Sequence, residues 1–292
     1  MRLTMMSTDN MPEMLLCDDN GLHYQVADLI HGTTDIPFYI RNSSHPTIKD
    51  LFSSTDIPAA LRWLEERTSS AHSVNTRDWT WATPDTGGSL FCVGRNYAAH
   101  ASELGNKVPG KPLFFMKPRG CLAANEQKVA IPSESDRVDY EGELALVVGR
   151  DLRGPISLVQ ARSAIVAVTL LNDITDRAQQ QQAKEKGKPW FRAKGRIGFA
   201  PVGPYLRFID SGIPLSEFRY TTSLNGEIVQ NGEPSLWLWN AETIVQDLSE
   251  SVGLECGDMI SMGTPAGVGP LKPGDVVELN STVIGTLRTE MF

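Results

Sequence analysis

The stretch from Val138 to Gly149 constrains this chain most, because it reads as a strand with two acidic side chains on one face. It is rich in aliphatic residues, contains no proline and ends at a glycine. Side chains alternate along a strand, so Glu141 and Glu143 point the same way, ~7 Å apart along the backbone. Aliphatic residues continue that face, which predicts that the two carboxylates are partly buried.

Two carboxylates held together away from water repel each other, and at neutral pH they need a cation or a shared proton. Oxygen ligands select magnesium, calcium or manganese. The spacing alone leaves two interpretations open. One is a site for a hard divalent cation, and the other is an edge strand whose glutamates face water.

Length and charge limit the classes of function. The 292 residues suffice for one large domain, or for one large and one small domain. A formal net charge of -8 argues against nucleic-acid binding, which needs a basic face. The longest apolar run, Ala164 to Leu171, is far shorter than the ~20 residues that span a bilayer, so we expect no membrane partner. No secretory signal is visible, and four scattered cysteines lack metal or redox spacing, which favours a cytoplasmic protein with reduced thiols.

The chain divides into two unequal parts. Residues 1–85 are interpreted as a small accessory region, with a hairpin around Asn20-Gly21 and a helix from Asp56 to about Arg67. Residues 86–292 are interpreted as the main domain. Its many short strands and few helices predict a β-rich α+β fold and not a doubly wound sheet.

The main domain contains one histidine, His100, in a predicted helix from Tyr97 to Leu104 that Asn96 would cap. Glu103 lies three residues later, so both side chains share a helix face. A carboxylate that orients an imidazole makes it a better general base. The alternative is a surface pair without a role.

Two further segments carry candidate site residues. Asp173 follows an aliphatic strand, at the predicted start of a helix that runs to about Lys186, so it is either a projecting ligand or a first-turn helix charge. Residues 263–270 hold three glycines and two prolines, which indicates backbone close to a ligand or, alternatively, a tight connection.

Eight short sequence segments, taken together and in their order along the chain, match the pattern of a known protein family. They are Val93-Gly94-Arg95-Asn96-Tyr97 through His100 and Glu103, Phe115-Met116-Lys117-Pro118, Asp139-Tyr140-Glu141-Gly142-Glu143-Leu144, Asn172-Asp173 with Arg177, Ala193-Lys194-Gly195, Pro201-Val202-Gly203-Pro204, Leu224-Asn225-Gly226-Glu227, and Gly257-Asp258 leading into residues 263–269. From about Phe91 to Leu287 the chain thereby resembles the fumarylacetoacetate hydrolase family.

The resemblance implies the fold of that family's C-terminal domain, with mixed β-sheets and a few short helices, and a homodimer. It implies Mg²⁺ or Mn²⁺, with Ca²⁺ as a substitute in a crystal, and a small keto acid as substrate. By position, the implied metal ligands are Glu141, Glu143 and Asp173. His100 and Glu103 match the water-activating pair, and Lys194 matches the active-site lysine. The implied substrate-contacting residues are Arg95, Tyr97, Lys117 and Thr264.

Three positions depart from the family pattern. Ala178 stands where many members have aspartate, and Arg196 and Ile197 stand where many have an aromatic residue and an acid. These residues help to shape the pocket, so they bear on substrate identity.

The residues suit hydrolysis of acylpyruvate-like 1,3-diketo acids at a metal-bound enolate. Decarboxylation, tautomerisation or isomerisation of related keto acids, such as oxaloacetate or hydroxy-dienedioates, is the alternative. A catalytically idle binding protein of the same fold is a third.

Overall fold

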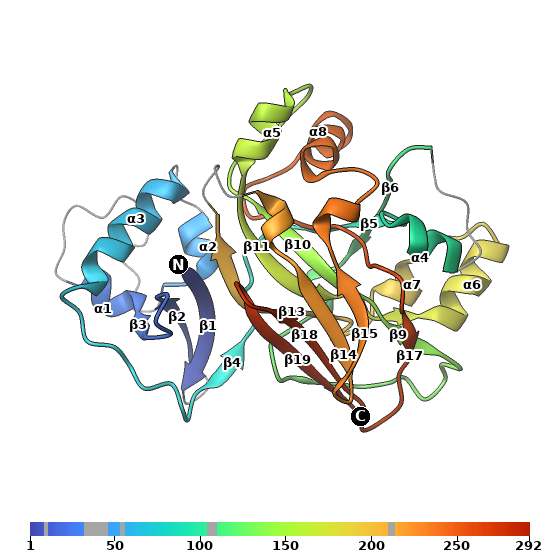
Figure 1. Cartoon of the computed structure of the whole chain (residues 1–292), viewed down its shortest axis with the longest axis horizontal. Coiled ribbons are helices and arrows are strands. Elements are labelled where there is room, and N and C mark those ends of the chain that lie inside the picture. The colour runs from blue at the N-terminus through green and yellow to red at the C-terminus, as the bar shows by residue number, and fades with distance from the viewer. Residues whose placement is uncertain (9–10, 32–45, 53–55, 104–109, 210–213) are drawn as a thin grey trace.

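The structure, a computed structural model, describes residues 1–8, 11–31, 46–52, 56–103, 110–209 and 214–292. Within these ranges the fold is α+β and β-rich, as predicted, with helices at the periphery of mixed sheets (Figure 1). No helix among the described residues is long and apolar enough to cross a membrane.

The centre of the molecule is an 11-stranded sheet. In order across the sheet its strands are β3 (His23–Gln25), β2 (Met11–Cys17), β1 (Arg2–Thr8), β13 (Ala200–Phe208), β11 (Ile165–Asn172), β10 (Gly142–Val148), β16 (Met259–Ser261), β5 (Leu90–Gly94) and β6 (Leu113–Lys117), with β4 (Thr80–Ala82) beside β1 and β7 (Leu122–Ala123) beside β13. Every residue of β10 and β11 is buried, because both faces of the sheet are covered there. These two strands form the rigid base of the candidate site.

Two smaller sheets complete the β structure. One has the order β15 (Glu227–Gly232), β14 (Tyr220–Leu224), β18 (Val276–Ser281), β19 (Gly285–Met291) and β8 (Lys128–Val129), and the other has β12 (Thr175–Asp176), β9 (Val138–Tyr140) and β17 (Gly269–Pro270). The glycine-rich loop predicted at residues 263–270 ends in β17, which pairs with β9 and so places Gly269 opposite Tyr140.

The predicted carboxylate strand is in fact two strands, β9 and β10, with Glu141 between them. At the break, Gly142 packs against a strand of the five-stranded sheet. A Cβ atom on Gly142 would lie 2.1 Å from Thr222 Oγ1, and the Tyr220 hydroxyl donates to the Gly142 carbonyl oxygen at 2.9 Å. Only glycine fits there, and the chain changes sheets at this point.

The helices are α1 (Val26–Ile30), α2 (Ile48–Phe52), α3 (Ile57–Thr68), α4 (Ala98–Glu103), α5 (Leu158–Ala164), α6 (Arg177–Glu185), α7 (Phe191–Lys194) and α8 (Ala241–Ser251). The predicted cap of α3 is confirmed, because the Asp56 side chain accepts the Ala59 amide at 2.9 Å. The start of α6 was predicted too early. The chain stays extended through β12, and Asp176 is the residue that caps α6. The first-turn interpretation of Asp173 is therefore wrong.

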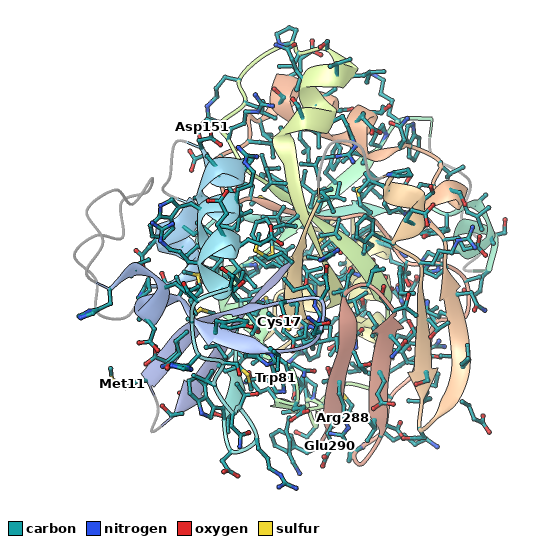
Figure 2. The ribbon with its side chains drawn as sticks, turned by 60° about the vertical axis from the view of Figure 1, so that its left-hand side comes forward. Met11, Cys17, Trp81, Asp151, Arg288 and Glu290 are labelled. Carbon is teal, nitrogen blue, oxygen red and sulfur yellow. The ribbon has the colours of Figure 1, made fainter. Side chains whose placement is uncertain are left out.

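The first 85 residues add strands to the far edge of the central sheet. β1 pairs antiparallel with β13, with Arg2 opposite Arg207. Figure 2 shows this side of the molecule, with Cys17 on β2 and Trp81 on β4 labelled. In Figure 1 the N-terminal helices and α4, α6 and α7 lie on opposite sides of the molecule, so this region supports the sheet away from the candidate site.

Candidate active site

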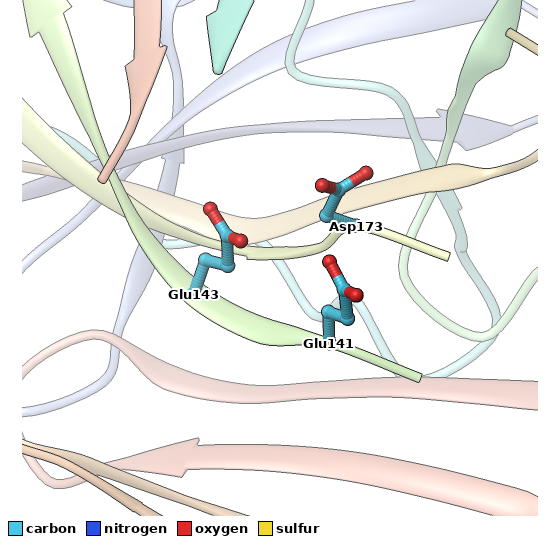
Figure 3. Close-up of side chains that lie close together, drawn as sticks. All are labelled: Glu141, Glu143 and Asp173. Carbon is cyan, nitrogen blue, oxygen red and sulfur yellow. The ribbon is translucent and has the colours of Figure 1, made fainter. Parts of the chain in front are cut away.

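Three carboxylates meet where β10 begins and β11 ends. Strand pairing places Gly142 opposite Asn172, which brings Glu141 and Glu143 beside Asp173. The Asp173 amide donates to the Glu141 carbonyl oxygen at 2.8 Å. One carboxylate oxygen from each residue lies within 4.8 Å of the others, and Figure 3 shows the three side chains converging. All three residues are at most 4% exposed, so the alternative of water-facing glutamates is wrong.

Two buried lysines contact these carboxylates. Lys194, at the end of α7, places Nζ 2.8 Å from Glu141 Oε2 and 2.5 Å from Asp173 Oδ2. Lys117, at the end of β6, places Nζ 2.8 Å from the other oxygen of Asp173, Oδ1. Lys117 Nζ also donates to the backbone carbonyl oxygens of Ile174, Lys194 and Phe199. Lys117 therefore joins the segments that carry Asp173 and Lys194.

Glu143 differs from the other two carboxylates, because no lysine or arginine in the described ranges contacts it. It accepts hydrogen bonds from Ser261 Oγ at 2.5 Å and from the Gly263 amide at 2.9 Å. Burial raises the pKa of Glu143 well above its usual value, and the neighbouring charges of Asp173 and Glu141 raise it further. A divalent cation would supply the missing positive charge, and three carboxylates are the oxygen donors that such a cation prefers.

Glu141 is held ionised by its neighbours. Burial by itself would raise its pKa, but the charges of Lys194 and Arg177 outweigh burial and hold the pKa well below its usual value. Arg177, the first residue of α6, forms ion pairs with Glu141 and Asp139 and donates to Gln180 Oε1 at 2.7 Å. These contacts fasten α6 to the carboxylate cluster.

The predicted His100–Glu103 pair lies on α4, with Nδ1 of the histidine 3.5 Å from Glu103 Oε2. That distance is long for a hydrogen bond. The Glu103 carboxylate also accepts the Gly267 amide at 3.0 and 3.2 Å, which ties α4 to the glycine-rich loop. Burial lowers the pKa of His100 below its ordinary value. The lowered pKa favours the neutral imidazole, which is the form that a general base needs.

Asn96 has a different role from the predicted helix cap. Its side-chain nitrogen donates to the carbonyl oxygens of Trp239 and Met262 at 3.2 and 2.9 Å, and its oxygen accepts the Trp239 amide at 2.9 Å. Both ends of the amide are thus used to hold the turn after β5. The predicted end of the helix, Leu104, lies outside the described residues.

Thr264 reaches the site from the glycine-rich loop, and Gln230 holds it there. The buried Gln230 amide donates to Thr264 Oγ1 at 2.8 Å and to the Pro265 carbonyl oxygen at 2.9 Å, while its oxygen accepts the Gly142 amide at 3.0 Å. Sequence reasoning missed Gln230, because a polar residue on a short strand ordinarily indicates a solvent-facing position. Its only signal was its place on the strand that returns from the Asn225-Gly226 turn, three residues after the end of a matching segment.

A cavity of about 30 Å³ lies among these groups. It is lined by Val93, Gly94, Arg95, His100, Phe115, Glu141, Glu143, Asp173, Arg177, Gln180, Lys184, Trp190, Lys194 and Thr264. Most residues proposed from the sequence are thus brought to one place. Glu103 stands behind His100, and Tyr97 and Lys117 are buried outside the cavity lining.

None of the three departures from the family pattern, Ala178, Arg196 and Ile197, lies in the lining of the cavity. Arg196 forms ion pairs with Glu134 at 2.8 Å and with Asp176, the cap of α6, at 3.0 Å. Ile197 is 87% exposed. Arg196 is therefore paired with the residue that caps α6.

Comparison with known proteins identifies the family of this chain. A sequence model described as "Fumarylacetoacetate (FAA) hydrolase C-terminal" matches residues 89–291. A mitochondrial oxaloacetate decarboxylase of Dictyostelium discoideum is 38% identical over 203 residues, covering 69% of this chain and 92% of that protein.

Two solved structures share the fold. Fumarylpyruvate hydrolase from Pseudomonas aeruginosa, in complex with Mn²⁺ and pyruvate, superposes with a TM-score of 0.65 at 30% identity, covering 70% of this chain and 88% of that one. A 2-hydroxyhepta-2,4-diene-1,7-dioate isomerase from Mycobacterium marinum superposes with a TM-score of 0.71 at 27% identity, covering 100% and 98%. These matches confirm the predicted resemblance and fold class. The chain belongs to the fumarylacetoacetate hydrolase family.

Proposed function

We propose that this protein is a divalent-metal-dependent hydrolase that cleaves a carbon–carbon bond in acylpyruvate-like 1,3-diketo acids. The observation that carries the proposal is the position of His100, with Glu103 beside it, in the same cavity as three carboxylates and a buried lysine. A water-activating base beside a cation site is what hydrolysis of such a substrate requires. The similarity to a fumarylpyruvate hydrolase that holds Mn²⁺ and pyruvate also supports it.

Different residues of the cavity would bind the metal ion and contact the substrate. Glu141, Glu143 and Asp173 would hold Mg²⁺ or Mn²⁺, which when bound supplies chelation of an α-keto acid and Lewis-acid polarisation of its oxygens. Thr264 Oγ1 already accepts a hydrogen bond from Gln230, so its own proton is free to donate to a substrate oxygen.

The hydrolytic step begins when His100 takes a proton from water, and Glu103 stabilises the imidazolium that forms. The water oxygen bonds to the distal carbonyl carbon. The bond from that carbon to the methylene carbon of the pyruvate half then breaks, and its electron pair passes to the pyruvate half. The Lys194 ammonium stabilises the developing negative charge, and the proton on His100 passes to the methylene carbon. The products are a carboxylic acid and pyruvate.

The second candidate is decarboxylation of a β-keto acid, which the 38% identity to an oxaloacetate decarboxylase favours. Loss of carbon dioxide also leaves negative charge on a pyruvate half, which Lys194 would stabilise. It consumes no water, so it does not need a general base for water activation. The two reactions therefore differ in their dependence on His100.

The substitution His100→Ala tests the proposal. Acylpyruvate hydrolysis should fall by about 10²–10⁴-fold, which is typical for loss of a general base, while any oxaloacetate decarboxylation should fall much less. Lys194→Ala should depress both reactions. Pyruvate release is measured at saturating Mg²⁺, circular dichroism checks the fold, and His72→Ala, at an exposed histidine, is the matched control. Wild-type hydrolysis by the His100→Ala protein would show that the histidine is not the base.

A further inference from the structure

The two buried lysines beside the carboxylates are held in different ways. The Lys117 ammonium contacts Asp173 and also donates to three backbone carbonyl oxygens at 2.6, 2.8 and 3.0 Å. The Lys194 ammonium is bonded to Glu141 and Asp173. Its one further interaction in the described part of the chain is with the face of the Phe115 ring, 4.8 Å from the ring centre. The carbonyl oxygens would keep Lys117 in place if Asp173 took another partner, whereas Lys194 has no such anchor.

Every oxygen of the Glu141 and Asp173 carboxylates contacts a cationic side chain. Lys194 contacts one oxygen of each, Oε2 of Glu141 and Oδ2 of Asp173. Arg177 contacts the other oxygen of Glu141, and Lys117 contacts the other oxygen of Asp173. A divalent ion that binds both carboxylates must therefore share, or take over, oxygens that already have a cationic partner.

Lys194 is the cation that such an ion would oppose most directly, because it bridges the two carboxylates. It is 2% exposed, and like charges a few Å apart repel strongly where little water screens them. Arg177 has a second ion pair, with Asp139, that holds it in place. We propose that Lys194 is a displaceable counter-ion, which neutralises Glu141 and Asp173 in the metal-free protein and competes with the metal ion for their oxygens. This inference rests on the proposed metal site.

The Lys194 ammonium can leave the carboxylates and still remain in the cavity. It already lies over the Phe115 ring, and both residues line the cavity, so a cation–π contact would hold the ammonium there. The Lys194 backbone is fixed, because its carbonyl oxygen accepts the Lys117 ammonium at 2.8 Å and its amide donates to the Trp190 carbonyl oxygen at 3.0 Å. Metal binding would thus turn the charge of Lys194 from the carboxylates toward the substrate, where the proposed mechanism uses it.

The competing possibility is that Lys194 organises the carboxylates for the metal ion. The two roles predict changes of opposite sign in metal affinity. If Lys194 competes with the ion, removal of its charge should strengthen metal binding. If Lys194 organises the site, its removal would leave Glu141 and Asp173 to repel each other, and metal binding should weaken. Lys194→Met tests this, because it removes the ammonium and keeps an unbranched side chain.

Electron paramagnetic resonance of free Mn²⁺ measures the affinity without any turnover. The Lys194→Met protein should bind Mn²⁺ about tenfold or more tightly than the wild type, as expected when one positive charge is removed from a buried cation site. Adding Glu143→Ala to the Lys194→Met protein should reverse this gain, which would show that the ion is bound at the carboxylates. Lys186→Met removes the same charge from an exposed position at the end of α6 and should leave the affinity unchanged.

Thermal unfolding gives a second measurement. The Tm of metal-free Lys194→Met should be lower than that of the metal-free wild type, because two buried carboxylates lose the cation that they share. Saturating Mn²⁺ should raise the Tm of the variant by more than it raises the Tm of the wild type, since tighter binding to the native state adds more stability. Lys194→Gln should behave in the same way, and it serves as the second neutral variant if methionine prevents folding.

The outcomes separate failure of the competition from failure of the metal site. Equal or weaker Mn²⁺ binding by both neutral variants would overturn the competition and leave the metal site intact, and so would their failure to fold in saturating Mn²⁺. Binding by the neutral variants but not by the wild type would support the competition. If none of these proteins binds Mn²⁺, the metal site and the competition are both wrong.

Discussion

At the scale of single residues, the surroundings of His100 predict how the activity should depend on pH. Burial lowers its pKa, and a divalent cation at the carboxylates would lower it further, because both disfavour the imidazolium. A lowered pKa means that the neutral base persists as the pH falls through the ordinary histidine value of about 6.5. We therefore expect kcat/KM for acylpyruvate hydrolysis to stay constant through that pH and to decline only below it. A pH–rate profile at saturating Mg²⁺ measures this, and an acid limb centred above 6.5 would argue against His100 as the base.

Single residues also show how much of the candidate site could be predicted from the sequence. Alternation along a strand was enough to put Glu141 and Glu143 on one side, and the structure places them together with Asp173. Lys117 matches a family position but carries no local signal of its contacts, because its partners lie 57 to 82 residues further along the chain. Contacts of that kind depend on strand order, which local patterns do not specify.

At the scale of elements, the site is held by links between separate strands and loops, and Gln230 is the clearest of these. It joins β15 to the glycine-rich loop and to the start of β10. Gln230→Leu would leave the buried Gly142 amide and Pro265 carbonyl unpaired, which should lower the free energy of unfolding by about 1–3 kcal/mol. Urea unfolding measures the change, and Asn231→Leu, at an exposed position on the same strand, is the control. Equal stability of the two variants would contradict this role.

Element boundaries were predicted well where a side chain caps a helix and poorly where tertiary contacts decide. The Asp56 cap of α3 follows from local hydrogen bonding. The division between β9 and β10 at Glu141 does not, because it arises from close packing of Gly142 against Thr222 of another sheet. The start of α6 was displaced for a similar reason, since pairing of β12 with β9 keeps the chain extended.

At the scale of the whole molecule, the N-terminal strands and the candidate site occupy different parts of the central sheet. The N-terminal strands extend the sheet beyond β13, and the carboxylates lie at the ends of β10 and β11 with α4, α6 and α7 nearby (Figure 1). The three carboxylates are buried, and Glu143 contacts no lysine or arginine in the described chain. A bound divalent ion should therefore stabilise the native state, and its removal should lower Tm.

The most direct test of the account is pyruvate release from an acylpyruvate by protein that has been stripped of metal and then reloaded. The stripped protein should release no pyruvate, and addition of Mg²⁺ or Mn²⁺ should restore the activity. Glu143→Ala, which removes one of the three carboxylates, should stay inactive after reloading and bind Mn²⁺ more weakly. Undiminished pyruvate release after exhaustive chelation, or none from the reloaded wild-type protein, would contradict the account.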